Sequence, residues 1–306
     1  MFSQQAISHR ETLRFRARIL SAIRGFFSAR DYLEVETPIR IPAPAPEAHI
    51  DAVPSGGWFL QTSPELCMKR LLAAGCERIF QICKCFRREE RGRRHLTEFT
   101  LLEWYRAGSD YFRMMDETEA MIRSAADAAG KGARLTYAGR EVDLEGPWDR
   151  VRVAEAFDRY AAVSMEKSLE TDRFDEVIAL EIEPRLGFQR PLFLYDYPEA
   201  SGALARLKPD DPTVAERFEL YIAGMELCNA FTELTDPAVQ RHRFEKEEAL
   251  RRRAGRAPYP SPEPFLEALA HMPAAGGNAL GVDRLVMLLA DAGTIDEVVA
   301  FTPESL

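Results

Sequence analysis

The sequence predicts an α+β protein in which helices flank an antiparallel sheet. Residues 78–86 and 98–105 alternate apolar and polar side chains on either side of a charged loop, as expected for a strand that turns and returns. Residues 217–234 also read as two strands, joined at Ala223-Gly224, which can form a two-residue turn. Apolar residues at helical spacing in 11–30 and 110–130 predict amphipathic helices beside these strands.

The remaining elements follow in chain order. Residues 32–38 predict a short strand that ends at Pro38, and the proline-rich run after it predicts an extended connection. Residues 65–75 predict a helix that ends at Gly75. Residues 135–190 suggest a short hairpin followed by helices, without a chemical motif. Residues 276–289 predict a glycine-containing strand that leads into an apolar helix.

The bulk composition is that of an ordinary globular protein. A chain of 306 residues with 46% apolar composition can bury a large core, and we expect one domain that spans residues 1–306. The net charge of −9 argues against a surface built mainly to hold tRNA or DNA. Five cysteines are an odd number and favour a reducing compartment. Because no secretory signal and no apolar run of ~18 residues is present, we expect a cytoplasmic protein without a membrane segment.

The returning strand at 98–105 carries functional side chains on one face. Phe99, Leu101, Glu103 and Tyr105 have the same parity, so a regular strand points all of them in one direction. Arg87 lies opposite and offers a planar cation that can grip a phosphate or a carboxylate. Such a face could hold a nucleotide and a cationic small molecule together. The competing interpretation is that the arginine-rich loop is merely solvated and that Tyr105 belongs to the core.

The second informative stretch predicts converging acids. With a turn at 223–224, Tyr221 pairs with Glu226, and Glu219 lies on the same face. Two carboxylates without histidine suit a hard cation such as Mg²⁺. Three further side chains share a face of the returning strand but have the opposite parity to Glu226: Asn229, Phe231 and Glu233. Both groups can serve one site only if a bulge or a twist separates them. Otherwise this segment is a solvent-facing hairpin with incidental acids.

The C-terminal segment predicts an anion site. Glycines at 276, 277 and 281 allow a ligand to approach the backbone closely. Arg284 follows near the predicted start of a helix, where free backbone N–H groups also favour a phosphate.

Together these segments resemble the motifs of a known family, the class II aminoacyl-tRNA synthetases, and within it the lysyl branch. Residues 34–38 resemble the end of motif 1, residues 86–105 resemble motif 2, and residues 277–289 resemble motif 3. Residues 62–66 and 226–234 add lysyl-type sequence between them. The resemblance implies the class II catalytic core, and a homodimer formed through motif 1.

Two departures from lysyl-tRNA synthetase narrow the resemblance. The motif 1 helix begins near residue 11, which leaves too few residues for the N-terminal anticodon-binding domain of that family, since a domain needs roughly 50 residues. In motif 3, Ala279 stands where the synthetase has glycine. The chain is therefore most similar to the lysyl-tRNA synthetase paralogues that modify a lysine of elongation factor P. That similarity implies elongation factor P as the protein partner and makes tRNA an unlikely one.

For the nucleotide, the resemblance implies ATP and Mg²⁺ as cofactors. Arg87 would hold the α-phosphate and the substrate carboxylate, and Arg284 would hold the γ-phosphate, which makes these two arginines the catalytic candidates. The other nucleotide-side assignments are Glu219 and Glu226 for Mg²⁺, Phe99 for the adenine ring, and Glu89 and His95 for further contacts with the nucleotide.

For the amino acid, the resemblance implies lysine or (R)-β-lysine, activated as an adenylate. Glu103, Tyr105 and Glu233 would receive the side-chain ammonium, Glu65 the other amine, and Asn229 the carboxylate. The remaining pocket residues would be Ser63, Phe231 and Ala279. Two alternatives stay open: a lysine–tRNA ligase without an anticodon domain, and a non-catalytic module that kept the synthetase fold.

Overall fold

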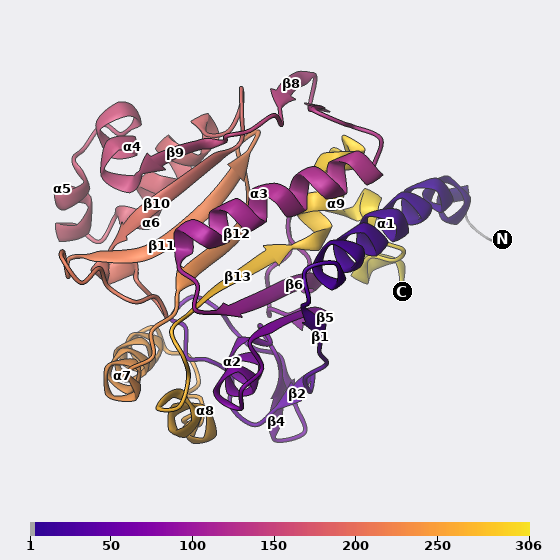
Figure 1. Ribbon diagram of the computed structural model, residues 1–306. Helices are drawn as coiled ribbons and strands as arrows, with labels where there is room; N and C mark the ends of the chain where they lie inside the picture. The colour runs from indigo at the N-terminus through magenta and orange to yellow at the C-terminus, as the bar shows by residue number, and fades with distance from the viewer. Residues whose placement is uncertain (1–3) are drawn as a thin grey trace.

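The structure is a computed structural model that describes residues 4–306, and an eight-stranded sheet runs through its centre (Figure 1). In spatial order, the strands are β1 (Leu33–Glu34), β5 (Arg78–Phe86), β6 (Glu98–Ala107), β13 (Ala275–Gly281), β12 (Met225–Thr232), β11 (Val214–Ile222), β10 (Leu192–Pro198) and β9 (Asp149–Arg152). The six inner strands, from β5 to β10, pair with one another in antiparallel fashion. At the two edges, β1 pairs parallel with β5, and β9 pairs parallel with β10. The α+β prediction is confirmed, but the sheet is mixed at its edges.

Two small sheets lie outside the main one. The first has the order β2 (Arg40–Ile41), β4 (Trp58–Leu60) and β3 (Pro54–Ser55). The second pairs β7 (Arg134–Tyr137) with β8 (Arg140–Asp143), which confirms the short hairpin expected there. The proline-rich connection after residue 38 is therefore partly ordered into a small sheet.

The helices expected at residues 65–75 and 110–130 are present with ends that differ by at most two residues, whereas the helix expected at 11–30 begins seven residues earlier, at Gln4. The α-helices are α1 (Gln4–Ser28), α2 (Glu65–Ala73), α3 (Tyr111–Ala128), α4 (Val153–Tyr160), α5 (Met165–Glu170), α6 (Phe174–Val177), α7 (Pro237–Arg253), α8 (Glu263–Leu269) and α9 (Val282–Ala290). The shorter helical turns are η1 (Ile178–Ile182), η2 (Glu183–Arg185), η3 (Glu199–Ser201), η4 (Ile295–Val298) and η5 (Pro303–Ser305). Within residues 4–306, no helix combines the length and apolar character that a membrane crossing needs.

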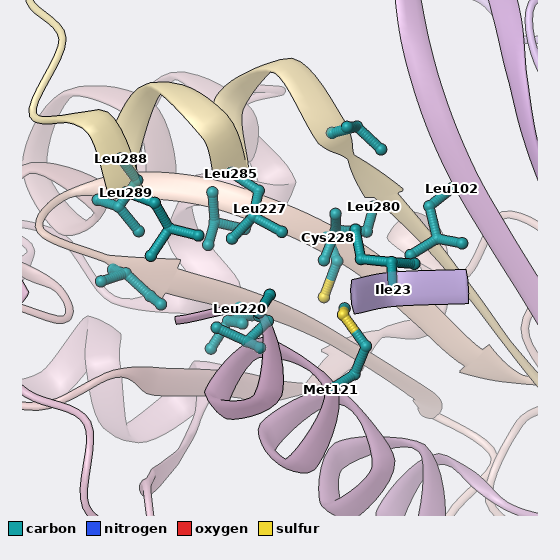
Figure 2. Packing of buried hydrophobic residues seen from close by; sticks show 14 of the residues in the cluster. Ile23, Leu102, Met121, Leu220, Leu227, Cys228, Leu280, Leu285, Leu288 and Leu289 are labelled. Atoms are coloured by element: carbon teal, nitrogen blue, oxygen red, sulfur yellow. The ribbon is translucent and has the colours of Figure 1, made fainter. Parts of the chain in front are cut away.

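One face of the central sheet is buried under α1, α3 and α9 (Figure 1). Leu102 and Trp104 alternate with the cavity-facing residues of β6 and are fully buried in this layer. Phe27 of α1 stacks on Phe80 with ring centroids 4.8 Å apart. Figure 2 shows the same layer further along the sheet, where leucines of the strands and of α9 pack with Met121 of α3. This face is filled mainly with apolar side chains, with buried polar contacts such as Asn278 to Thr118 and Tyr32 to Glu117.

The hairpin of β11 and β12 has the predicted two-residue turn. Ala223 and Gly224 have φ values of 53° and 69°, the left-handed pair that a tight turn of this kind requires. Tyr221 pairs with Glu226, as predicted, but Glu219 pairs with Asn229 because the register shifts by one residue between them. This bulge turns the side chains of Glu226 and Asn229 toward the same face. The bulge that is needed for Glu226 and Asn229 to serve one site is therefore present.

Candidate functional site

A cavity of about 350 Å³ lies on the face of β6, β13, β12 and β11 opposite to α1, α3 and α9. The pairing register places Glu103 opposite Ala279, and Ala279 opposite Asn229, so one row of side chains crosses the cavity floor. The structure brings together around this cavity the following predicted residues: Ser63, Glu65, Arg87, His95, Phe99, Glu103, Tyr105, Glu219, Glu226, Asn229, Phe231, Glu233, Ala279 and Arg284. Side chains that are far apart in the sequence therefore meet on one surface.

Glu89 was expected to contact the nucleotide, but the structure does not place it among the residues that line the cavity. Its φ of 65° turns the backbone, and its side chain is 79% exposed beside Arg88. The next residue, Glu90, lines the cavity instead and lies 3.8 Å from Arg87. Alternation along a strand could not settle which of the two acids faces inward, because both lie in the loop that follows β5.

Glu103 is a buried carboxylate at one end of the cavity. Its Oε1 accepts a hydrogen bond from Ser63 Oγ at 2.5 Å, and its Oε2 accepts one from Tyr105 Oη at 2.8 Å. Burial, with the nearby charge of Glu65, raises the pKa of Glu103 well above its ordinary value. A cation bound here would pair with the ionised carboxylate and offset the cost of burying its negative charge.

Lys69 holds two further carboxylates at the same end. Its Nζ lies 2.6 Å from Glu65 Oε1 and 2.5 Å from Glu233 Oε2. Burial raises the pKa of Glu233 to about 7, against the opposing effect of Lys69. Glu233 lies directly against Gly277, where any side chain would overlap its Oε1 and the ring of Tyr105.

Arg87 lines the cavity, and one N–H group of its guanidinium has no hydrogen-bond partner among the described residues. Its Cζ is 5.2 Å from the centroid of the Phe99 ring. Its Nε is buried and has no hydrogen-bond partner among the residues that the structure describes. A buried N–H group without a partner is costly, and an anionic ligand would satisfy it.

Arg284 projects into the cavity from the first turn of α9. Its Nη1 donates to the Glu226 backbone carbonyl at 3.0 Å and to Glu226 Oε2 at 3.1 Å. Its Nη2 donates to His95 Nε2 at 2.5 Å. Partial burial, with the charges of Arg284 and other arginines, lowers the pKa of His95 to about 4. His95 is therefore neutral near pH 7 and does not repel the two arginines.

Glu219 and Glu226 are the two carboxylates assigned to Mg²⁺, and both line the cavity. Glu219 Oε1 accepts from Arg217 Nη2, and Glu219 Oε2 accepts from Tyr197 and Tyr221 Oη, each at 2.6 Å. Within residues 4–306, no three His, Cys, Asp or Glu side chains are arranged to hold a metal ion by themselves. Two carboxylates fit a hard cation that takes its other oxygens from a phosphate chain. Because both oxygens of Glu219 already accept hydrogen bonds and Glu226 is paired with Arg284, the two carboxylates do not make a complete cation site, and Mg²⁺ would depend on the oxygens of a bound nucleotide.

Sequence reasoning missed several residues that line the cavity or lie directly behind it. Lys69 stands four residues after Glu65 on a predicted helix, and that spacing was a usable signal for an ion pair. Arg217, two residues before Glu219, donates its Nε to Asn229 Oδ1 at 3.0 Å and so leaves the amide nitrogen as the donor. Glu47, whose pKa burial raises to about 7, lines the cavity from the proline-rich segment and had no signal in the sequence.

Comparison with known proteins agrees with these motifs. A family model described as class II tRNA synthetases (D, K and N) matches residues 4–305. The chain is similar to elongation factor P–(R)-β-lysine ligase of Edwardsiella ictaluri, with 40% identity over 94% of this chain and 93% of the relative. The protein of the same name from Vibrio campbellii is 38% identical, with 97% of each chain covered. Lysine–tRNA ligase of Magnetococcus marinus is 39% identical over 95% of this chain, but only 64% of the relative is covered. The chain belongs to the class II tRNA synthetase family of the D, K and N type.

Proposed function

We propose that this protein is an ATP-dependent ligase that activates (R)-β-lysine or lysine as an adenylate and transfers it to a lysine ε-amine of elongation factor P. The observation that carries the proposal is the meeting of Arg87, Arg284 and the carboxylate cluster around one cavity. The names of the relatives matched along nearly their whole length supply the acceptor. We further propose that the chain acts as one catalytic domain in the cytoplasm.

In the first step, a carboxylate oxygen of the amino acid attacks the α-phosphorus of ATP, and pyrophosphate leaves. Arg87 is suited to bring these two anions together, since its buried Nε lacks a partner. Arg284 neutralises the terminal phosphates, and Phe99 offers a flat surface for adenine. Mg²⁺ held by Glu219 and Glu226 would neutralise further phosphate charge.

In the second step, the acceptor amine attacks the carbonyl carbon of the adenylate. A new amide bond forms, AMP leaves with the electron pair of the broken bond, and the amine loses its proton to solvent. Glu103, Glu65 and Glu233 hold the amino acid by its two ammonium groups during both steps. The chain then needs to provide alignment and charge more than acid or base catalysis.

Mass spectrometry of elongation factor P after incubation with the enzyme, ATP and each lysine isomer tests the proposal. We expect a mass increase of one lysyl residue, and amino-acid-dependent ATP–pyrophosphate exchange by the enzyme alone. A second candidate function is charging of tRNA with lysine, which the 39% identity to a lysine–tRNA ligase favours. Robust tRNA charging without modification of elongation factor P would overturn our choice, and no exchange with either isomer would favour a non-catalytic module.

We propose that the protein forms a homodimer through the segment that resembles motif 1. Leu33 and Ile39 are large apolar residues on either side of residues 34–38, yet they are 57% and 43% exposed. A two-fold partner that covers this surface would bury them. Sedimentation across a range of concentrations measures the association, and a monomer at every concentration would contradict it.

Amino-acid binding should weaken as the pH falls below about 7. The pKa of Glu233 is raised to about 7, so its ionised fraction falls roughly tenfold between pH 8 and pH 6, and only the ionised form attracts an ammonium. Glu103 changes in the same direction. We expect KM for the amino acid to rise about tenfold over this range in pyrophosphate exchange. The KM for ATP serves as the control, and an amino-acid KM that does not change with pH would refute the assignment.

Ala279→Gly should shift preference toward α-lysine. The Ala279 methyl group lies between Glu103 and Asn229 on the cavity floor, where the amine and carboxylate ends of the substrate are distinguished. (R)-β-lysine carries its amine one carbon further from the carboxylate, so removal of a methyl group changes which isomer fits. We expect the ratio of kcat/KM values to change by about tenfold, as for one methylene in a pocket. Unchanged discrimination between the isomers would remove Ala279 from the specificity determinants.

A further inference from the structure

We propose that Lys69 is a positioning residue for diamino acids: its ammonium group fixes Glu65 and Glu233, two of the three acids at one end of the cavity, so that the three acids together can balance Lys69 and two substrate ammonium groups. This inference rests on the proposed function, because the cavity must bind a diamino acid for Lys69 to have this role. It goes beyond that function by assigning a role to a residue that is not itself expected to touch the substrate.

Lys69 is a buried cation with two anionic partners. Only 1% of its side chain is exposed, and its Nζ lies 2.6 Å from Glu65 Oε1 and 2.5 Å from Glu233 Oε2. It also lies 5.9 Å from the centroid of the Phe231 ring, a wall of the cavity. Burial alone would lower the pKa of Lys69, but the two carboxylates raise it above its ordinary value. The ammonium is therefore charged at every pH at which the enzyme would be assayed.

The ion pairs fix the orientation of the carboxylates. Lys69 holds Glu233 through Oε2, while Oε1 is buried and has no hydrogen-bond partner among the described residues. Glu65 is held through Oε1, and its backbone N–H donates to Ser63 Oγ at 3.0 Å. Ser63 in turn donates to Glu103. One connected network therefore sets the positions of all three acids before a substrate arrives.

The same contacts set the charge of the cavity. If all three acids are ionised, their carboxylates and the one ammonium of Lys69 sum to two net negative charges at this end of the site. Because burial raises the pKa of Glu103 and of Glu233, the empty site holds part of this charge as bound protons, which bound cations would displace. A diamino acid brings two ammonium groups, which balance that charge. Without Lys69 the site would have one negative charge in excess, and burial would remove it by protonation of an acid.

Removal of Lys69 should change the pKa of Glu233, because Lys69 lowers that pKa. The groups that face Glu233 are Lys69 and Glu65 from α2 and Tyr105 from β6, and Tyr105 in turn donates a hydrogen bond to Glu103. Lys69 is the only cation among these named groups. An opposite charge this close lowers the pKa of an acid by roughly one to three units, so its removal should raise the pKa of Glu233 by at least about one.

The test is Lys69→Met, assayed by amino-acid-dependent pyrophosphate exchange from pH 7 to pH 9. If the pKa of Glu233 rises from about 7 to about 8, its ionised fraction at pH 7 falls from about one half to about one eleventh. We expect KM for the diamino acid at pH 7 to rise at least about fivefold, and the ratio of variant to wild-type KM to shrink toward pH 9. The KM for ATP should stay within about twofold. Lys84→Met, which removes an exposed lysine 3.6 Å from Glu98, is the matched control and should change neither value.

Two further variants keep the inference testable if Lys69→Met does not fold. Lys69→Gln is also neutral but can donate hydrogen bonds to both acids, and it should show the same pH-dependent KM defect. Lys69→Arg keeps the charge but changes the shape of the head group, so KM should rise without a change in the pH profile. A KM ratio independent of pH in the neutral variants, or a shifted profile in Lys69→Arg, would overturn the role of Lys69. Wild-type enzyme without any amino-acid-dependent exchange would instead refute the proposed function.

Discussion

Gly277→Ala should strongly impair activation of the amino acid while leaving most of the fold intact. A Cβ at this position would overlap Glu233 Oε1 and the ring of Tyr105. Neither side chain can move freely, because Glu233 is ion-paired to Lys69 and Tyr105 is buried and bonded to Glu103. Displacing one partner of a buried charge pair costs about 2–5 kcal/mol, so kcat/KM for the amino acid should fall by about 30-fold or more.

The matched control for this substitution is Gly25→Ala. Gly25 lies in α1, and a methyl group there would meet no heavy atom within 4 Å. Alanine is a better helix former than glycine by up to about 1 kcal/mol, so this variant should be slightly more stable and fully active. Pyrophosphate exchange and thermal melting measure both variants. A Gly277→Ala enzyme with a wild-type KM for the amino acid would show that Glu233 is not where the substrate binds.

Glu103→Gln should destroy amino-acid binding without destabilising the protein. Burial raises the pKa of Glu103 well above its ordinary value, so the free enzyme does not benefit from a charge at this position. Glutamine has the same shape and can still accept the hydrogen bond from Ser63, which makes a melting temperature equal to that of the wild type, or higher, the expected result. A bound ammonium would lose its counter-ion, at a cost of about 2–5 kcal/mol, and KM should rise by about 30-fold or more.

Glu98→Gln on the same strand is the control for this second substitution. The Glu98 side chain is 55% exposed and lies near Lys84 rather than near the cavity. Its replacement should leave both the melting temperature and KM unchanged. If Glu103→Gln instead lowered stability and left KM unchanged, the carboxylate would be a structural acid and the amine would have to bind elsewhere.

The parts of the fold that could be predicted from the sequence are those with a local signal. Along β6, Phe99 and Glu103 face the cavity while Leu102 and Trp104 face the helices, and this alternation is visible in the sequence. The turn at 223–224 has a local signal as well, and it fixes the pairing of the hairpin. Most of the candidate site could be located in this way, because its residues come from such strands.

The parts that could not be predicted depend on distant contacts. β10 is buried on both faces, so it shows no alternation, and the polar strand β9 is only four residues long. A lysine is seldom buried, so Lys69 looked like an ordinary helix residue until Glu233 was placed beside it. The need for glycine at 277 likewise arises from side chains of two other segments, Tyr105 and Glu233.

The bulge in β12 makes chain length, and not only residue identity, a determinant of activity. It adds one residue between Glu226 and Asn229 relative to the pairing on β11. Deleting that residue would restore regular pleating and rotate Glu226 to the helix-covered side of the sheet, even with every functional side chain retained. The half of the cavity assigned to phosphate would then lose one of its two acids, Glu226, while the half assigned to the amines kept all of its groups. Among related chains, we therefore expect β12 to tolerate substitutions at positions outside the site more readily than the deletion of one residue.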